Sequence, residues 1–233
     1  MGLGEETKSM KVIYRMTDIP STNPSPIYFD NKFRLNEICL RSFVRAFRDI
    51  KPQVAMICDH CPDFYEEFVK SIVPFPMTIE FTSTGVKGNA IHQYDYFMDD
   101  DVYLFQECDY LYTDGAGQKM LDAIEKFDFI SPYDHPDKYK EGMIPTQNEK
   151  RIINGQEWRS TDSTTSTFMA RGKTLAKTIE FFIYWGWEDH KRWLDLNTKG
   201  YTLWTPVPSL ATHMVSEYLA PNIDWKKEWE KYE

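Results

Sequence analysis

Short apolar runs alternate with helix-like segments through the first 133 residues, and this alternation limits the possible folds more than any other feature of the sequence. Segment 34–50 places Leu35, Ile38, Phe43 and Phe47 at helical spacing and leaves Arg and Glu outward. Five runs are rich in β-branched and aromatic residues, as strands are: 11–16 (KVIYRM), 53–58 (QVAMIC), 77–82 (MTIEFT), 101–106 (DVYLFQ) and 128–133 (DFISPY). The alternation predicts an α/β fold with a mostly parallel central sheet and helices on both faces.

The chain changes character after residue 140. Segment 140–158 has turn signals and little periodicity, and the last stretch, 223–233, is either a short docking helix or a frayed tail. Between them the sequence predicts a Thr-rich strand, two helices and an extended segment with two prolines: 163–170, 174–185, 187–200 and 201–213. We expect one domain over 10–233, preceded by an N-terminal extension, 1–9.

Charge and hydropathy exclude several classes of protein. The 233-residue chain carries a formal net charge of -9 at pH 7, whereas a nucleic-acid surface gathers Lys and Arg into a positive field. We therefore expect no nucleic-acid partner. No apolar stretch approaches the roughly 20 residues that span a bilayer, and the first residues lack the pattern of a signal peptide. These features predict a soluble, cytoplasmic protein.

Two of the four cysteines, Cys58 and Cys61, form a C-x-x-C between a predicted strand and a predicted helix. This is the setting of a thioredoxin-type redox pair, so a redox protein is one alternative. The chain is much larger than one redox module, and its sequence has no second C-x-x-C to complete a zinc site. We expect ordinary buried or half-buried thiols.

Polar residues follow the predicted strands. In open parallel sheets, ligands bind outside the carboxyl ends of the strands. The residues at those ends are Arg15 and Asp18, Asp59, Thr84 to Asn89, Glu107 and Asp109, and Asp134 and His135. Acids at several consecutive strand ends suit a divalent cation, because Mn²⁺ and Mg²⁺ prefer carboxylate oxygen.

Glu107 and Asp109 stand two positions apart directly after an apolar run, with Cys108 between them. Side chains at i and i+2 project to the same side while the backbone is extended. One or two carboxylates and substrate phosphates usually complete the shell of such an ion. A lone acid-x-acid pair is more often an exposed turn, so the neighbouring sequence has to decide.

Three stretches together resemble the A-fold (GT-A) nucleotide-sugar glycosyltransferases, and the resemblance covers most of residues 10–225. FQECDYLYTDGAGQKMLDAI, 105–124, stands where that family carries its D-x-D motif. FDFISPYDHPDKY, 127–139, resembles the following stretch in a small viral and bacterial group, including enzymes of large algal viruses. YWGWEDHKRWLDLNTKGYTLWTPVPSLATH, 184–213, resembles the Glu-Asp pair, Gly-aromatic turn and late His of inverting family-2-like transferases.

The resemblance implies a GT-A fold with a nucleotide-binding half, 10–112, and a smaller acceptor half, 113–233. It also implies an inverting, metal-dependent transfer of a hexose, pentose or deoxyhexose. The donor would be a UDP-, GDP- or dTDP-sugar, and the acceptor a hydroxyl group of a glycan or glycoprotein. If the chain is viral, the reaction would take place in the host cytoplasm.

The metal site implied by the resemblance consists of Glu107, Asp109 and His213. Asp109 matches the last acid of D-x-D and would bind the Mn²⁺ or Mg²⁺ that bridges the diphosphate. Glu107 matches the first acid, and His213 is a further ligand. Cys108 replaces a frequent second Asp, which leaves the affinity for the metal open.

On the donor side, the resemblance together with position at the strand ends selects Arg15, Asp18, Asp59, Gly85, Gly88 and Asn89. Asp59 matches an acid that reads the N–H of the pyrimidine base. Gly85, Gly88 and Asn89 match a loop against the nucleotide, and Arg15 would reach the base or a phosphate.

A general base must take the proton of the acceptor hydroxyl. Asp189 is the first candidate, at the Glu-Asp position of the family, and Asp162 is the substitute. The alternative explanation of Asp189 is an acid stabilised at a helix N-terminus. Asp134 and His135 belong either to the site or to an Asx-type turn.

Alternatives to a glycosyltransferase remain open. Sugar-phosphate nucleotidylyltransferases share the fold, but they normally carry a Gly-rich loop with Arg and Lys after the first strand, which YRMTDIPSTNPSP lacks. A non-catalytic carbohydrate- or nucleotide-binding module is also compatible with the sequence. Aromatic planes pack on sugar rings, so four tryptophans are either an acceptor platform or core residues: Trp158, Trp185, Trp187 and Trp204.

Overall fold

The computed structural model describes residues 10–98, 101–140 and 149–233, so the expected extension 1–9 lies outside the described residues. The strands are β1 (Met10–Thr17), β2 (Gln53–Asp59), β3 (Met77–Thr82), β4 (Val102–Glu107), β5 (Tyr110–Tyr112), β6 (Phe129–Ile130), β7 (Lys150–Ile153), β8 (Gln156–Thr161), β9 (Phe168–Arg171), β10 (Leu203–Val207) and β11 (Ala211–His213). The α-helices are α1 (Lys32–Phe47), α2 (Tyr65–Ile72), α3 (Gly85–His92), α4 (Ala116–Ile124), α5 (Gly172–Trp185), α6 (Asp189–Thr198) and α7 (Trp225–Trp229). Short 3₁₀ helices are η1 (Gln93–Tyr96), η2 (Pro136–Tyr139), η3 (Ser216–Tyr218) and η4 (Glu230–Tyr232).

In the described part of the chain, nine strands form one central sheet in the order β3-β2-β1-β4-β9-β6-β10-β8-β7. Strands β1 to β4 pair in parallel, and so do β6 and β10. Strands β8 and β9 run against their neighbours. The expected mostly parallel sheet is thus confirmed, with antiparallel strands in its second half.

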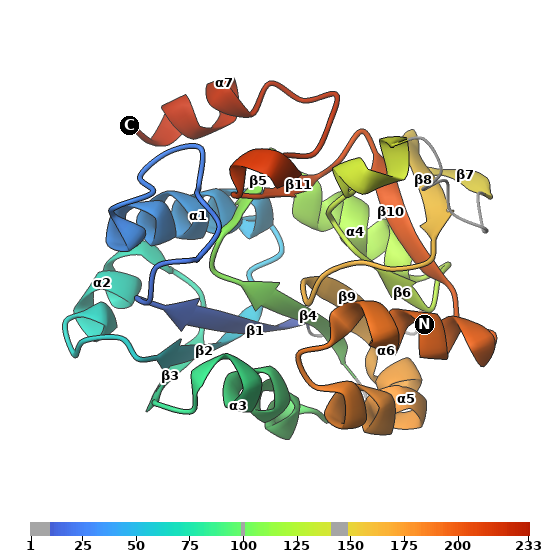
Figure 1. Cartoon of the computed structure of the whole chain (residues 1–233), viewed down its shortest axis with the longest axis horizontal. Helices are drawn as coiled ribbons and strands as arrows, with labels where there is room; N and C mark the ends of the chain where they lie inside the picture. The colour runs from blue at the N-terminus through green and yellow to red at the C-terminus, as the bar shows by residue number, and fades with distance from the viewer. Residues whose placement is uncertain (1–9, 99–100, 141–148) are drawn as a thin grey trace, which may run out of the picture.

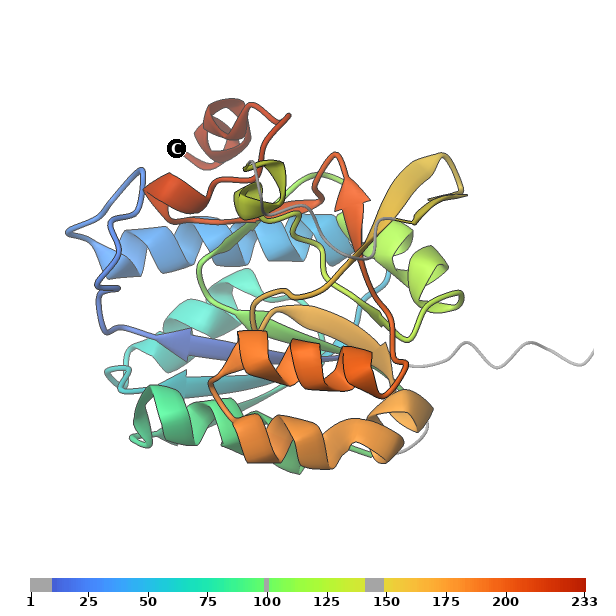
Figure 2. The ribbon, with the colours of Figure 1, turned by 45° about the vertical axis from the view of Figure 1, so that its right-hand side comes forward.

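Helices cover both faces of the sheet, as the alternation of elements predicted (Figure 1). Helices α1, α2 and α4 pack on one face around a core that includes Tyr14, Phe43 and Met120. Helices α5 and α6 pack on the other face through Phe182 and Trp193, with α3 beside them (Figure 2). Side chains alternate across β1, so Tyr14 meets α1 while Arg15 stays at the other face and the carboxyl edge.

The sequence analysis missed the β7–β8 hairpin, most of which lies in segment 140–158, where turns were predicted. Asn154 and Gly155 both have positive φ, 46° and 82°, as a two-residue hairpin turn requires. The Asn-Gly dipeptide was the available signal, but the strands around it lack clear alternation. The outer strand β7 is largely exposed.

The second half also departs from its predicted boundaries. The Thr-rich strand expected over 163–170 is ordered as a strand only from Phe168, because hydroxyl groups before it make side-chain hydrogen bonds instead of ladder bonds. Strand β6 keeps two of its six expected residues. The C-terminal stretch is a docking helix, with Trp225 buried at 3% exposure.

A second, two-stranded sheet joins β5 to β11. Its register places His213 opposite Tyr110, and Ala211 opposite Tyr112. The pairing brings together segments about 100 residues apart in sequence, which local patterns do not reveal. It carries His213 to the end of β4.

Candidate functional site

Two pockets lined in part by charged and polar residues lie where the parallel strands end. The Arg15 pocket has a volume of about 350 Å³. Its lining comes from the ends of β1, β2 and β4 and from the starts of α1 and α3: Arg15, Met16, Thr17, Ile19, Pro20, Ser21, Thr22, Lys32, Asp59, Val86, Asn89, Glu107, Cys108 and Asp109. Five of the residues selected from the sequence, Arg15, Asp59, Asn89, Glu107 and Asp109, therefore share one pocket.

Each acid of the Glu107–Asp109 pair faces a cation. The β1–β4 register sets Arg15 opposite Glu107, and Arg15 Nη2 lies 3.0 Å from Glu107 Oε1. Lys32, the first residue of α1, places Nζ 3.8 Å from Asp109 Oδ2. The two acids thus open onto the same pocket, as the sequence predicted, but protein cations already neutralise part of their charge.

His213 completes this group. Its Nε2 lies 3.4 Å from Asp109 Oδ2, and its ring stacks on Tyr110 with centroids 5.1 Å apart. The hydrogen bond of 2.8 Å from Met214 N to Asp109 O fixes the two segments together. Asp109 and His213 are therefore adjacent, as the predicted metal site requires.

The ionisation of this group follows from its surroundings. Burial raises the pKa of Glu107, and the Asp109 charge adds to that rise while Arg15 opposes it. Burial would also raise the pKa of Asp109, but His213 and Lys32 outweigh it and lower that pKa below its ordinary value. Burial alone would lower the pKa of His213, whereas Asp109 raises it. The pKa values of the two acids are therefore shifted in opposite directions, upward for Glu107 and downward for Asp109.

Asp59 holds the loop between β3 and α3. Its Oδ1 accepts hydrogen bonds from Thr84 N and Thr82 Oγ1, each at 2.8 Å, and further bonds come from Thr84 Oγ1 and Gly85 N. His60 Nδ1 lies 3.0 Å from its other oxygen. The side chain is therefore committed to protein donors, and recognition of a base by Asp59 stays a prediction.

The two predicted glycines shape this loop. Gly85 has φ +71°, in the left-handed region. A Cβ on Gly88 would lie 2.6 Å from Thr84 Cβ, so only glycine fits without a shift. Asn89 follows them, and its buried Oδ1 has no hydrogen-bond partner among the described residues. Asn89 is one of the residues that line the Arg15 pocket.

Asp18 lies just outside the Arg15 pocket. Its carboxylate accepts a hydrogen bond from the hydroxyl group of Tyr65 on α2. Asn36 donates to Thr17 O at 2.8 Å and so holds the same strand end. The structure thus gives Asp18 a partner in the fold, and its predicted part in donor binding remains untested.

The Asp189 pocket, of about 270 Å³, adjoins this group through His213. Its lining combines histidines, hydroxyl groups and two acids: His135, Asp137, Lys138, Ser163, Thr164, Thr165, Asp189, His190, His213 and Tyr218. Asp189 is the first residue of α6, and its Oδ1 accepts a hydrogen bond of 2.7 Å from His190 N. It is thus a helix N-terminal acid that also faces a pocket.

Asp162, the substitute base, follows β8 and is not among the residues that line the Asp189 pocket. Its backbone oxygen accepts a hydrogen bond of 2.7 Å from Asn197 Nδ2 on α6. This contact ties the chain before β9 to the helix that begins with Asp189. Of the two predicted bases, the structure brings Asp189 to the pocket.

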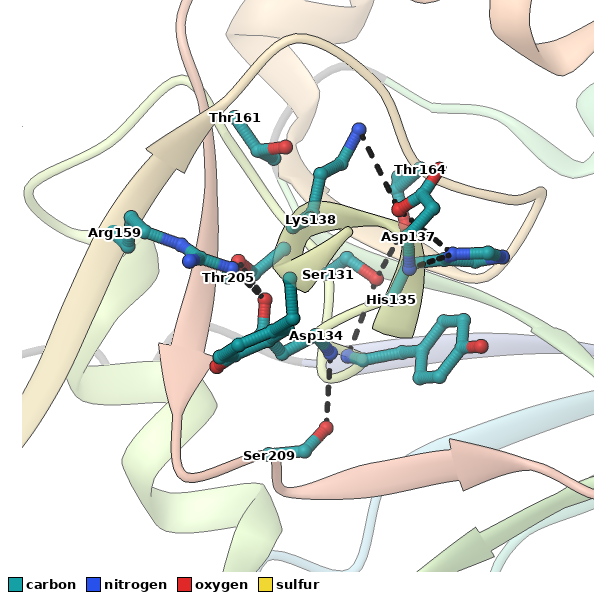
Figure 3. A network of polar contacts seen from close by, with 12 residues as sticks. Ser131, Asp134, His135, Asp137, Lys138, Arg159, Thr161, Thr164, Thr205 and Ser209 are labelled. Carbon is teal, nitrogen blue, oxygen red and sulfur yellow. Dashed lines mark hydrogen bonds and ion pairs between the residues drawn. The ribbon is translucent and has the colours of Figure 1, made fainter. Parts of the chain in front are cut away.

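Figure 3 shows the polar contacts around the turn after β6. His135, Asp137 and Lys138 of this segment line the Asp189 pocket. Asp134 is buried at 1% exposure, and Arg159 Nη2 lies 2.5 Å from its Oδ1. Tyr139 donates to Asp134 Oδ2 at 2.6 Å. Asp134 thus has a structural part, whereas its neighbour His135 lines the pocket and pairs with Asp137, with 2.8 Å between Nδ1 and Oδ1.

The residues suit a divalent ion only with help from a ligand. Within the described residues, no set of three His, Cys, Asp or Glu side chains is placed to hold a metal. Asp109 and His213 nevertheless offer a carboxylate oxygen and an imidazole nitrogen, and both suit Mn²⁺. Because Mg²⁺ and Mn²⁺ sites commonly combine one or two protein ligands with substrate phosphates, this pair fits such an ion.

Sequence reasoning missed Lys32 in the Arg15 pocket, and Asp137, Lys138 and His190 in the Asp189 pocket. A signal for Lys32 existed, because a lysine in the first turn of a helix opposes the helix dipole. For the other three, no spacing in the sequence indicates that η2 and α6 meet at one pocket.

The structure shows the surroundings of the four tryptophans and four cysteines considered in the sequence analysis. Trp158 and Trp204 are buried in the core at 0% and 2% exposure, and Trp185 Nε1 donates to Asp195 at 3.1 Å. Trp187, two residues before Asp189, is 50% exposed. All four cysteines are free thiols, and Cys61 is only partly buried.

A larger pocket, of about 560 Å³, lies at the opposite edge of the sheet, where β1, β2 and β3 begin. Lys11 and Asp95 are its charged lining residues, fewer than in the Arg15 pocket. The acids, histidines and buried cations gather at the carboxyl edge, so the two pockets there form the candidate site.

Comparisons place this architecture among known folds. The sequence matches no protein-family model and no curated protein. Inositol-1-phosphate CTP transferase from T. maritima is similar in structure, with a TM-score of 0.52, 9% identity, and coverage of 87% of this chain and 90% of that one. 4-Diphosphocytidyl-2C-methyl-D-erythritol synthase from Anaerococcus prevotii DSM 20548 has a TM-score of 0.50 and 12% identity, covering 84% and 85%. The galactosyltransferase LgtC, solved with donor and acceptor sugar analogs, has a TM-score of 0.48 and 10% identity, covering 80% and 69%.

At these identities the likeness establishes the fold alone, and it confirms the predicted α/β fold with a mostly parallel central sheet. Among the helices in the described ranges, none combines the length and apolar character needed to cross a membrane.

Proposed function

We propose that the protein transfers a sugar from a nucleotide-diphosphate donor to a hydroxyl group of a glycan. One observation carries this proposal. The two pockets at the carboxyl edge adjoin at Asp109, which lines one, and His213, which lines the other, and the Oδ2 and Nε2 atoms of these residues lie 3.4 Å apart. A transferase needs a site for each substrate on either side of the reacting carbon, and these pockets supply the two sites.

The Arg15 pocket would hold the nucleotide of a UDP-, GDP- or dTDP-sugar. Asn89 offers a buried carbonyl oxygen to a donor on the base or ribose. Arg15 and Lys32 lie next to the two acids and offer positive charge to phosphates. A divalent ion held by Asp109 and His213, with Glu107 nearby, would neutralise charge that grows on the departing diphosphate.

The Asp189 pocket would hold the acceptor. Asp189 accepts the proton of the acceptor hydroxyl as that oxygen bonds to the anomeric carbon of the sugar. The bond from that carbon to the diphosphate oxygen breaks, and its electrons leave with the diphosphate in the Arg15 pocket. Because entry and departure occur on opposite sides, we propose inversion at the anomeric carbon.

The test compares Asp189→Asn with Asp162→Asn in release of nucleoside diphosphate from a panel of UDP-, GDP- and dTDP-sugars. Loss of a general base lowers the rate by about 10²- to 10⁴-fold. We expect this loss for Asp189→Asn, with binding of the nucleotide unchanged. A normal rate in Asp189→Asn with a large loss in Asp162→Asn would move the base to Asp162.

A second candidate function is nucleotidyl transfer. Arg15, near the end of β1, and Lys32, the first residue of α1, both line the Arg15 pocket. The sequence contains no Gly-rich loop there, yet the fold supplies the two cations that such chemistry uses. Release of pyrophosphate from CTP or UTP in the presence of sugar phosphates, without turnover of any nucleotide-sugar, would favour this function.

A further inference from the structure

Lys138 is the one lysine or arginine among the described residues that line the Asp189 pocket. It belongs to the 3₁₀ helix η2, and its side chain is 10% exposed. Figure 3 shows its ammonium on the side of Asp137 and Thr164. Charged side chains are seldom buried to this extent unless they are paired. The partners of Lys138 therefore decide what the pocket can bind.

Within the described part of the chain, the ammonium of Lys138 makes two long contacts. Its Nζ lies 3.4 Å from Ser163 Oγ and 3.8 Å from Asp137 Oδ1, and the second distance exceeds hydrogen-bond range. Asp137 Oδ1 is nearer to His135 Nδ1, at 2.8 Å. Because an ammonium has three N–H donors, most of the hydrogen-bonding capacity of Lys138 is left for a ligand.

The turn around Lys138 is held in place by the buried Asp134. The Asp134 carboxylate accepts a hydrogen bond of 2.6 Å from the Tyr139 hydroxyl, which closes the turn on both sides of Lys138. Arg159 Nη2 lies 2.5 Å from the same carboxylate, and Asp134 N donates to Ser209 Oγ at 2.9 Å. A group that is fixed before its ligand arrives loses less conformational entropy on binding. Lys138 is therefore a preorganised positive charge.

The rest of the lining suits a sugar that brings a negative charge to Lys138. Asp189 would be engaged by the reacting hydroxyl, and Asp137 lies against His135. The chain as a whole carries a net charge of -9, so an acidic sugar needs a local cation to offset the repulsion. Hydroxyl side chains in the lining can bond to the hydroxyl groups of the sugar, among them Ser163, Thr164 and Thr165.

We propose that the Asp189 pocket selects an acceptor sugar with an anionic group, a carboxylate or a phosphate ester, and that Lys138 binds this group. The inference rests on the proposed function and specifies its acceptor, because a neutral sugar would leave the ammonium without a close partner. Lys138 then determines specificity, while Asp189 takes the proton of the reacting hydroxyl. Both residues line one pocket of about 270 Å³, as the binding of a single sugar residue requires.

The experiment measures dissociation constants of monosaccharides by saturation-transfer NMR titration of the full chain. The probes are glucuronate, glucose 6-phosphate and neutral glucose, each added to the protein alone and to the protein with Mn²⁺ and UDP, GDP or dTDP. The variants are Lys138→Met, Lys138→Arg and Lys140→Met. Lys140 is the matched control, because it is an exposed lysine at the end of the same turn and does not line the Asp189 pocket. Thermal unfolding of each variant confirms that it is folded.

We expect wild type to bind at least one of the two charged sugars at least about tenfold more tightly than glucose, because hydrogen bonds to charged groups are the stronger ones. The tighter of the two identifies the group as a carboxylate or a phosphate ester. Lys138→Met should lose this preference and keep the affinity for glucose, whereas Lys138→Arg and Lys140→Met should retain the preference. A lysine with a merely structural part would change the affinities for charged and neutral sugars together.

Equal affinity of wild type for charged and neutral sugars would overturn the inference, and so would a preference that survives in Lys138→Met or the binding of none of the probes. In each of these cases, binding of a nucleoside diphosphate with Mn²⁺ would leave the proposed function standing. If the preference depends on Lys138 but no nucleotide binds, the pocket stands as a site for acidic sugars and the proposed function fails. If Lys138→Met does not fold, the comparison of charged and neutral sugars in wild type and Lys138→Arg still decides.

Discussion

Replacing Arg159 with methionine should strongly destabilise the protein, because it leaves the Asp134 carboxylate buried without its cation. Asp134 is 1% exposed and Arg159 is 9% exposed, and 2.5 Å separates Arg159 Nη2 from Asp134 Oδ1. Removing one partner of a buried pair costs about 3–5 kcal/mol. In a chain of this size each kcal/mol lowers the melting temperature by about 2–4 °C, so we expect a drop of roughly 10 °C.

Urea unfolding followed by circular dichroism measures this cost. The control is Arg48→Met, which removes an arginine whose side chain is 70% exposed beside Asp49 and should change stability by less than about 0.5 kcal/mol. The double variant Asp134→Asn/Arg159→Met should be more stable than Arg159→Met alone, because no unpaired charge stays buried. A loss below about 1 kcal/mol in Arg159→Met, or strict additivity in the double variant, would refute this reasoning.

Two further predictions concern the loop beside the Arg15 pocket. Hydrogen bonds from His60 and the loop outweigh burial and lower the pKa of Asp59, so its contribution to stability is present above about pH 4 and is lost as the pH falls. Asp59→Asn should therefore reduce the dependence of the free energy of unfolding on pH in that acidic range. An unchanged dependence would contradict this contribution of Asp59. Gly88→Ala should cost about 1–3 kcal/mol by overpacking, because its Cβ would lie 2.6 Å from Thr84 Cβ. Thermal unfolding checks this, and a variant as stable as wild type would show that the loop adapts.

The sequence predicted the first half of the fold well, because each strand and helix there shows its own local pattern. The run 11–16 and the segment 34–50 became β1 and α1 with small shifts in their ends. Glu107 and Asp109 were found for the same reason: parallel strands that end at one edge bring their next residues together.

The rest depends on contacts between distant segments. The β5–β11 pairing that carries His213 to Asp109 joins two three-residue strands, too short to show a pattern. For His213, the family resemblance indicated what local patterns could not. Likewise, Asp134 looked like a turn residue or a site residue, and only the approach of Arg159 from β8 shows it to be a buried ion pair.

Other departures reflect competition between local preferences. The Thr-rich segment 163–167 has strand propensity, but Thr164 donates to Ser131 at 2.9 Å and Thr165 shares a 2.6 Å hydrogen bond with Tyr110. Such side-chain bonds compete with the sheet ladder. The same bonds place hydroxyl groups in the Asp189 pocket.

The central claim is that the Arg15 pocket binds a nucleoside diphosphate together with a divalent ion at Asp109. The most direct measurement is calorimetric titration with UDP, GDP and dTDP, each with Mn²⁺ and with chelator, on wild type and Asp109→Ala. The account predicts that one diphosphate binds most tightly with Mn²⁺ and that Asp109→Ala removes the contribution of the metal. Failure of all three to bind wild type under either condition would contradict it and favour a module that binds carbohydrate alone.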